Sequence, residues 1–242
     1  MLSIFEAAVN VFTFIYVLNF LPWCSFCVSM ACMRILLVNG SPRQDGCTHT
    51  ALAEMAAAFE AEGAETLIYH IGAEPIAPCR ACRGCARAKR CVIEDKVNEF
   101  VELARGYDGF VIGSPVHYAS ASGSLVAFMD RAFFSDYVGG FNSFAHKPAA
   151  AVASARRAGT TATLDQIQKY FTISQMPIIS GRYWNMVHGF TPDDVRQDAE
   201  GLQNLRYVAR NMVYHLRCKE AAAAAGILPP VQEKPVYTHF IS

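Results

Sequence analysis

The sequence lacks an excess of either charge. Its 242 residues include 21 lysines and arginines and 21 aspartates and glutamates, so the formal net charge is zero. A neutral chain offers no global attraction to nucleic acid or to an anionic membrane surface. We therefore expect no nucleic-acid partner, and any charge-driven binding must be local.

The chain also lacks the motifs of several enzyme classes. It contains no H-E-x-x-H, no Ser/His/Asp order and no paired carboxylates, so nothing in it supports a hydrolase. G-x-G-x-x-G and G-x-x-x-x-G-K-[ST] are both absent, so the sequence contains neither the dinucleotide-binding fingerprint nor a P-loop.

Charge is missing altogether from Ala7 to Cys32, an apolar stretch long enough for one transmembrane helix. No Lys or Arg precedes it, so the basic start of a signal peptide is missing, and Pro22 interrupts the span. We predict that residues 1–32 are a hydrophobic extension, either a leader outside the fold or a membrane anchor, and favour the leader. The clustered cysteines are typical of a reducing compartment, so we expect a cytoplasmic protein, membrane-anchored only if the extension is retained.

From Met33 onward, apolar runs of strand length alternate with segments of helical period. The runs are RILLVN, TLIYHI, DGFVIGSP, PAAAVASA and MPIIS, and a long helix is predicted from Pro192. This alternation predicts a three-layer α/β sandwich, with a five-stranded parallel sheet and helices on both faces. We place the domain at 33–220 and an Ala- and Pro-rich tail at 221–242.

Ligands of such sheets bind beyond the carboxyl ends of the strands. The first strand runs directly into NGSPRQDGCTHT and then into a helix. Its glycines allow close backbone approach, and Ser41, Arg43, Thr48 and Thr50 add hydroxyls and a charge beside the helix N-terminus. The pattern predicts a site for a terminal monophosphate; the alternative is an ordinary turn with Thr48 as the helix cap.

Two later loops reach the same edge. GSPVHYASASGSLVAFMDR offers an apolar edge at Pro115 and Val116 and an aromatic face at Tyr118, which suit a planar ring. His117 is a candidate for hydrogen bonding or proton transfer, or else an exposed loop histidine. SARRAGTT brings arginines to this edge, as an anion contact or as a solvated basic turn.

Three stretches resemble the flavodoxin-like NAD(P)H-dependent FMN reductase superfamily, and the resemblance runs from Met33 to Leu216. They are MRILLVNGSPRQDGCTHTAL, GSPVHYASASGSLVAFMDR and RYWNMVHGFTPDDVRQDAEGLQNLRYVARNM. The resemblance implies a flavodoxin-like sheet of strand order 2-1-3-4-5, bound FMN, and NADPH or NADH as co-substrate. It assigns FMN contacts to Ser41, Arg43, Cys47, Thr48, Thr50, Pro115, Val116, His117, Tyr118, Ser154, Arg156 and Gly159. Cys47 departs from the small polar residue of many relatives, which leaves the phosphate more dependent on backbone N–H groups.

Four of the nine cysteines lie in CRACRGCARAKRC, with the spacing C-x2-C-x2-C-x5-C at Cys79, Cys82, Cys85 and Cys91. This compact run is typical of iron-sulfur ligation, whereas structural zinc usually takes two separated pairs. Within the superfamily it resembles the iron-sulfur flavoproteins, which implies a [4Fe-4S] cluster. Zinc and free or redox-active thiols remain alternatives. The surrounding basic residues would lower the thiol pKa values and offset the charge of a cluster.

We therefore expect an FMN-dependent NAD(P)H oxidoreductase that passes electrons to a flavin, a quinone or a similar acceptor. The alternatives are an iron-sulfur flavoprotein electron carrier and a thiol-based flavin-binding redox sensor. The resemblance also implies a homodimer or homotetramer. An aromatic stretch would serve either as its interface or as core: Phe133, Phe134, Tyr137, Phe141 and Phe144.

Overall fold

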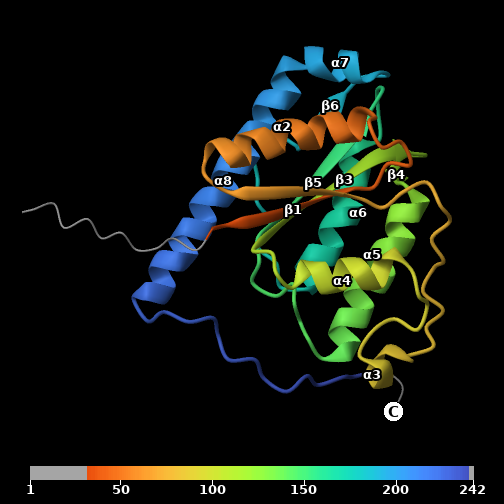
Figure 1. The fold of residues 1–242 in the computed structure, drawn as a ribbon, viewed down its shortest axis with the longest axis vertical. Coiled ribbons are helices and arrows are strands. Elements are labelled where there is room, and N and C mark those ends of the chain that lie inside the picture. The colour runs from red at the N-terminus through yellow and green to blue at the C-terminus, as the bar shows by residue number, and fades with distance from the viewer. Residues whose placement is uncertain (1–31, 240–242) are drawn as a thin grey trace, which may run out of the picture. The chain divides into compact units, whose positions relative to one another are not determined.

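The computed structural model describes residues 32–239 (Figure 1). The predicted extension therefore lies, apart from Cys32, outside the described residues. The central sheet has five parallel strands in the spatial order β2 (Glu65–His70), β1 (Arg34–Asn39), β3 (Gly109–His117), β5 (Ala149–Ala155) and β6 (Met186–His188). Numbered along the chain, this is the order 2-1-3-4-5, so the expected flavodoxin-like sheet is confirmed.

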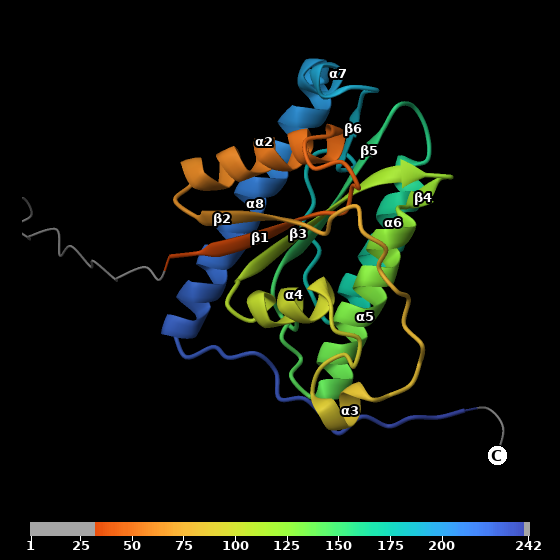
Figure 2. The same cartoon turned by 45° about the vertical axis from the view of Figure 1, so that its right-hand side comes forward.

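A two-residue strand, β4 (Ser120–Ala121), folds back antiparallel onto the end of β3. The helices are α2 (Cys47–Ala61), α3 (Cys85–Ala88), α4 (Lys96–Ala104), α5 (Gly123–Gly139), α6 (Thr160–Ile173), α7 (Pro192–Gln197) and α8 (Ala199–Ala224). Figure 2 shows α2 and α8 over one face of the sheet and α4 and α5 over the other. Among the described residues, no helix has the length and hydropathy of a membrane span.

Both faces of β1 are buried, which explains its continuous apolar sequence. Successive side chains of a strand point to opposite faces. Leu36 and Val38 join the core beneath α4, α5 and α6, whereas Ile35 and Leu37 join the core beneath α2 and α8. The apolar run of the sequence thus becomes two separate cores, one on each side of the sheet.

The predicted fifth strand at MPIIS is wrong. That segment makes only an isolated bridge, between Ile178 and Ala149, and the edge strand is β6. The side chain of Asn204, on α8, accepts hydrogen bonds from the backbone N–H groups of Arg182 (2.7 Å) and Tyr183 (2.9 Å). This buried amide draws the chain away from the sheet, and pairing resumes only at Met186.

The single long helix predicted from Pro192 is divided into α7 and α8 at Asp198. The Asp198 carboxylate accepts from the N–H of Gly201 (2.9 Å) and from that of His188 on β6 (2.7 Å). It caps the start of α8 and ties that start to the sheet edge. At its other end, α8 continues to Ala224, inside the segment assigned to the tail, and residues 225–239 form no helix or strand.

The aromatic stretch at the end of α5 serves two roles. Phe133 and Phe144 are buried and their rings stack at a centroid distance of 4.5 Å, so these two belong to the core. Phe134, Tyr137 and Phe141 are exposed. An interface with another subunit at these three exposed side chains therefore stays a prediction.

We expect Phe128→Ala to lower the free energy of unfolding by about 3–5 kcal/mol, because the ring is fully buried between α4 and the sheet. Its centroid lies 4.9 Å from that of Phe100. Chemical denaturation measures the change. The control, Phe190→Ala, removes an exposed ring and should change stability by less than about 0.5 kcal/mol. Equal losses in the two variants would contradict this description of the core.

Candidate functional site

The loop after β1 is held tightly by its own residues. The buried side chain of Asn39 accepts from the N–H of Ser41 (3.1 Å) and donates to the carbonyl of Gln44 (3.0 Å). Gly40 donates to the carbonyl of Gly113 on β3 (2.8 Å). A side chain at Gly40 would come within 2.6 Å of Leu125, so only glycine lets the loop pass this close to α5.

The N-terminus of α2 faces this loop without a side-chain cap. The cap residue is Gly46, and Thr48 lies inside the helix with its hydroxyl 2.8 Å from that of Ser154. The alternative of a Thr48 cap is therefore wrong. Among the described residues, the N–H groups of Cys47, Thr48 and His49 have no acceptor. Three free donors and the positive end of a 15-residue helix give this loop a geometry suited to an anion.

Cys47 begins α2, and its sulfur lies 3.8 Å from the carbonyl oxygen of Gly189. Burial raises the pKa of this thiol. A neutral thiol contributes little to anion binding, which agrees with the expectation that backbone N–H groups carry the contact. Thr50 also donates to the backbone, at the carbonyl of Gly46 (3.2 Å).

The second loop is a tight hairpin between β3 and β4. Tyr118 and Ala119 both have left-handed backbones, with φ of 51° and 58°, as a two-residue hairpin turn requires. Pro115 and Val116 are partly buried, whereas His117 and Tyr118 are exposed. No hydrogen bond within residues 32–239 orients the His117 ring, so the structure supplies no partner for proton transfer at this side chain.

Gln166 of α6 fixes this hairpin, and the sequence did not reveal it. Its side-chain oxygen accepts from the hydroxyl of Ser120 (2.7 Å) and from the N–H of Ala121 (2.9 Å). Asn39, by contrast, stands between a predicted strand and its glycine turn, where a short amide often bonds to nearby backbone. That position was a usable signal, but nothing in the spacing linked Gln166 to a loop 45 residues earlier.

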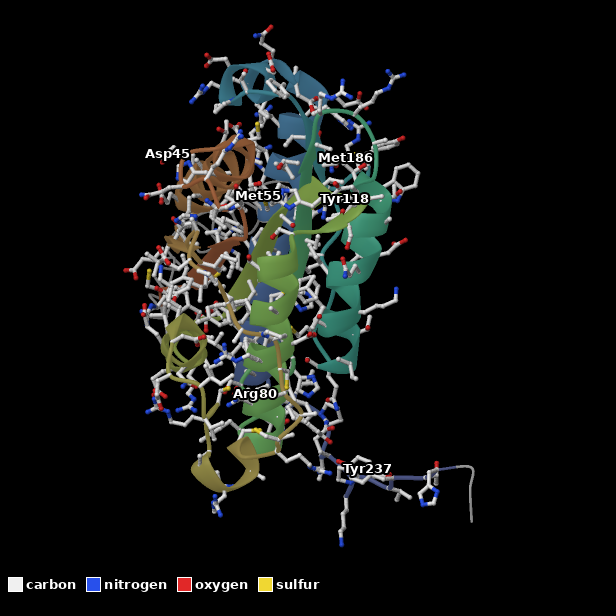
Figure 3. The ribbon with its side chains drawn as sticks, turned by 90° about the vertical axis from the view of Figure 1, so that its right-hand side faces the viewer. Asp45, Met55, Arg80, Tyr118, Met186 and Tyr237 are labelled. Atoms are coloured by element: carbon white, nitrogen blue, oxygen red, sulfur yellow. The ribbon has the colours of Figure 1, made fainter. Side chains whose placement is uncertain are left out.

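The third loop joins the other two. Ser154 is buried against Thr48, while Arg156 is exposed. Gly159 has a left-handed backbone (φ +92°), and a Cβ there would lie 2.7 Å from the Cα of Ala119. The second and third loops therefore touch. Figure 3 shows Asp45, Tyr118 and Met186 at one end of the molecule, far from Arg80.

The cysteine loop forms a separate site at the opposite end of α5 (Figure 1). The four cysteines line one pocket, together with residues of α5 that include Arg131, Phe134 and Ser135. At 1.5 Å per residue, about 18 Å of helix separates Ser122, which contacts the first loop through Gly40, from Phe134. Cys85 is buried, Cys91 is partly buried, and Cys79 and Cys82 are exposed.

The backbone of the cysteine loop contains a left-handed residue followed by a right-handed one. Arg83 is left-handed (φ 53°) and Gly84 right-handed (φ −58°), a pair that directs successive N–H groups to one side, as at many iron-sulfur and phosphate sites. Within the described chain, the N–H groups from Arg80 to Gly84 have no acceptor. Four free thiols with unpaired donors beside them suit the thiolates and sulfides of a cluster.

The predicted lowering of the thiol pKa values is wrong for Cys85. Burial raises the pKa of this thiol, and negative charge on the other three cysteines would raise it further. In residues 32–239, no three His, Cys, Asp or Glu side chains converge closely enough to ligate a single metal ion. A [4Fe-4S] cluster makes a different demand, since each thiolate binds its own iron at a separate corner.

A doubly wound parallel sheet of this strand order, with helices on both faces, defines a flavodoxin-like α/β protein. The model of the NADPH-dependent FMN reductase family matches residues 33–191, and the chain belongs to this family. The expected resemblance is thus confirmed, and the protein is an FMN-dependent oxidoreductase that uses a nicotinamide nucleotide.

Several iron-sulfur flavoproteins are similar to this chain. One from Methanocaldococcus jannaschii is 29% identical over 192 residues, which cover 74% of this chain and 95% of that protein. Another, from Methanosarcina thermophila, is 29% identical over 185 residues, covering 74% and 93%.

Solved structures share the fold at low sequence identity. RosB with bound 8-demethyl-8-formylriboflavin-5'-phosphate has a TM-score of 0.63 and 14% identity, over 87% of this chain and 93% of that one. An NAD(P)H:quinone oxidoreductase from Methanothermobacter marburgensis has a TM-score of 0.59 and 14% identity, over 75% and 96%.

We expect Gly159→Ala to destabilise the protein more than Gly140→Ala. Both glycines are left-handed, but a Cβ at Gly140 meets open space, whereas one at Gly159 strikes Ala119 and Val116. Gly140→Ala should cost about 1–2 kcal/mol for the backbone alone. Gly159→Ala should cost about 1–3 kcal/mol more because of overpacking. Denaturant titration measures both, and equal losses would mean that the two loops do not pack as described.

Proposed function

We propose that the protein accepts a hydride from NADPH or NADH onto bound FMN and passes the electrons to a flavin, a quinone or a similar acceptor. The observation that carries the proposal is the uncapped N-terminus of α2, with the free N–H groups of Cys47, Thr48 and His49 beside the end of β1. This geometry fits the terminal phosphate of FMN.

The phosphate would be held mainly by the backbone and by Arg43. The hydroxyl of Ser41 already accepts from the N–H of Arg43 (3.1 Å), and that of Thr50 donates to Gly46. These hydroxyls shape the loop around the anion. The exposed guanidinium of Arg43 remains available for a charge-assisted contact.

The ring system would lie over the second and third loops. FMN, when bound, supplies the hydride and single-electron chemistry of the reaction. The chain's own groups position the ring: Pro115 and Val116 give a partly buried apolar edge, and Gly159 allows the two loops to close together. We propose that Ser154, Arg156, His117 and Tyr118 complete this surface, His117 as a positioning group only.

We expect Arg43→Gln to weaken FMN binding about tenfold to a hundredfold, because it removes one charged hydrogen bond to the phosphate. Fluorescence titration of FMN into the apoprotein measures the affinity. At saturating FMN, NADPH should still bleach the flavin absorption under anaerobic conditions. The control is Arg217→Gln, since Arg217 lies at the far end of α2, where it donates to the carbonyl of Glu62 (2.9 Å).

Two outcomes would count against the proposal. If the wild-type protein binds FMN but NADPH and NADH do not reduce that FMN, the proposed hydride transfer from the nicotinamide nucleotide is wrong. Equal loss of affinity in the Arg43 and Arg217 variants would remove the phosphate assignment at the first loop.

The second candidate function is an electron carrier with a [4Fe-4S] cluster at Cys79, Cys82, Cys85 and Cys91. It is favoured by a specific observation: all four sulfur-bearing residues line one pocket, beside backbone donors that have no acceptor among the described residues. The similarity to iron-sulfur flavoproteins over 74% of the chain supports the same assignment. Such a carrier would exchange electrons with a ferredoxin-like partner.

We expect anaerobically purified protein to contain about four irons and four labile sulfides per chain. Cys85→Ala should lose most of both while FMN is retained, since the two sites lie at opposite ends of α5. Cys218→Ala, which removes an exposed cysteine elsewhere, serves as the control. Iron and sulfide assays with flavin quantification measure the result. A wild-type protein without iron whose thiols are reversibly oxidised would instead favour the redox sensor.

A further inference from the structure

Arg131 of α5 is the one large charged side chain that the structure buries completely among the described residues. It is 1% exposed and lines the cysteine pocket. Burial of a guanidinium is costly unless its donors are satisfied. Arg131 lies at the middle of α5, and none of its hydrogen bonds reaches the loops after β1, β3 or β5, so its burial needs another explanation.

The five N–H donors of Arg131 all have acceptors, and all of these lie in the chain around the cysteines. Nε donates to the sulfur of Cys91 (3.3 Å). Nη1 reaches the carbonyl of Ala77 (3.4 Å) and one oxygen of Asp95, and Nη2 reaches the carbonyl of Ile93 (3.0 Å) and the other oxygen of Asp95 (2.9 Å). The planar guanidinium, whose five N–H donors have fixed directions, therefore has all of its donors satisfied.

These acceptors bracket the cysteine run. Ala77 precedes Cys79, whereas Ile93 and Asp95 follow Cys91. One side chain therefore holds both ends of a loop that otherwise contains only the four-residue helix α3. Asp95 is itself fixed, because it caps α4 by accepting from the N–H of Val97 (3.0 Å). The loop is thus tied through Arg131 to α4 and α5.

We propose that Arg131 is the positioning residue of the cysteine pocket: it holds both ends of the loop so that the sulfurs face one space, and it donates a charged hydrogen bond to Cys91. The second part rests on the proposed cluster. An N–H···S bond from a cation stabilises the more negative, reduced state of a thiolate-ligated cluster, so Arg131 raises its midpoint potential.

Arg80 provides a matched control. It lines the same pocket and carries the same charge, but it is exposed and makes no hydrogen bond to a described residue. Lysine at position 131 keeps the charge and lacks the fork, so Arg131→Lys separates charge from geometry. Flavin content reports whether each variant folds, because the hydrogen bonds of Arg131 all go to residues 77–95, outside the proposed FMN loops.

The experiment compares wild type, Arg131→Gln, Arg131→Lys and Arg80→Gln as full-length chains. Hydrogen exchange is measured on the metal-free proteins, and midpoint potential after reconstitution with ferrous iron and sulfide. We expect Arg131→Gln to speed amide exchange across 79–95 about tenfold or more, with β1 and α2 unchanged. It should hold less iron, and its residual cluster should have a more negative potential. Arg131→Lys should be intermediate, and Arg80→Gln should leave exchange unchanged with a smaller shift in potential.

If amide exchange across 79–95 were as slow in Arg131→Gln as in the wild type, Arg131 would not hold the loop. An equal shift of potential in Arg80→Gln and Arg131→Gln would overturn the role of the hydrogen bond, since charge alone would then explain it. A wild-type protein that takes up no iron would refute the cluster, and the exchange comparison would still decide whether Arg131 holds the loop. If Arg131→Gln does not fold, as judged by flavin content, Arg131→Lys decides both points.

Discussion

Helix α5 is the element on which both sites depend, because its start and its middle are hydrogen-bonded to two different loops. At its start, the hydroxyl of Ser122 donates to the carbonyl of Gly40 (2.7 Å), which places the loop after β1 against the helix. In its middle, Phe128 and Met129 are buried in the core. Two residues further on, still in the middle of the helix, Arg131 holds the cysteine loop. A displacement of α5 would therefore disturb the two sites together.

The two sites use charge in different ways. At the loop after β1, the positive potential comes from backbone N–H groups and the start of α2, with the exposed Arg43 nearby. At the cysteine loop, a fully buried guanidinium is balanced by Asp95 and also contacts a sulfur. The first arrangement suits a ligand that arrives from water already charged. The second suits a group assembled within the protein, whose charge changes during electron transfer.

Sequence reasoning succeeded where the deciding interactions are local. Continuous apolar runs predicted four of the five parallel strands, and the helical period after the glycine turn predicted α2. It failed where a distant polar side chain decides the path. Asn204 draws residues 182–183 off the sheet, so MPIIS pairs at one residue only, and Asp198 ends α7 to begin α8. A single buried amide or carboxylate produces no periodic pattern in the sequence, so the sequence does not predict its hydrogen-bond partner.

By itself, the sequence determined the class of fold, the order of the loops along the chain and the spacing of the four cysteines, because these follow from hydrophobic period, glycine positions and residue identity. Only the tertiary structure decided which side chains hold those loops. Gln166 meets the hairpin and Arg131 meets Cys91 across 45 and 40 residues of sequence. Such contacts exist only after helices pack on the sheet, because packing is what brings the donor and the acceptor within hydrogen-bonding distance.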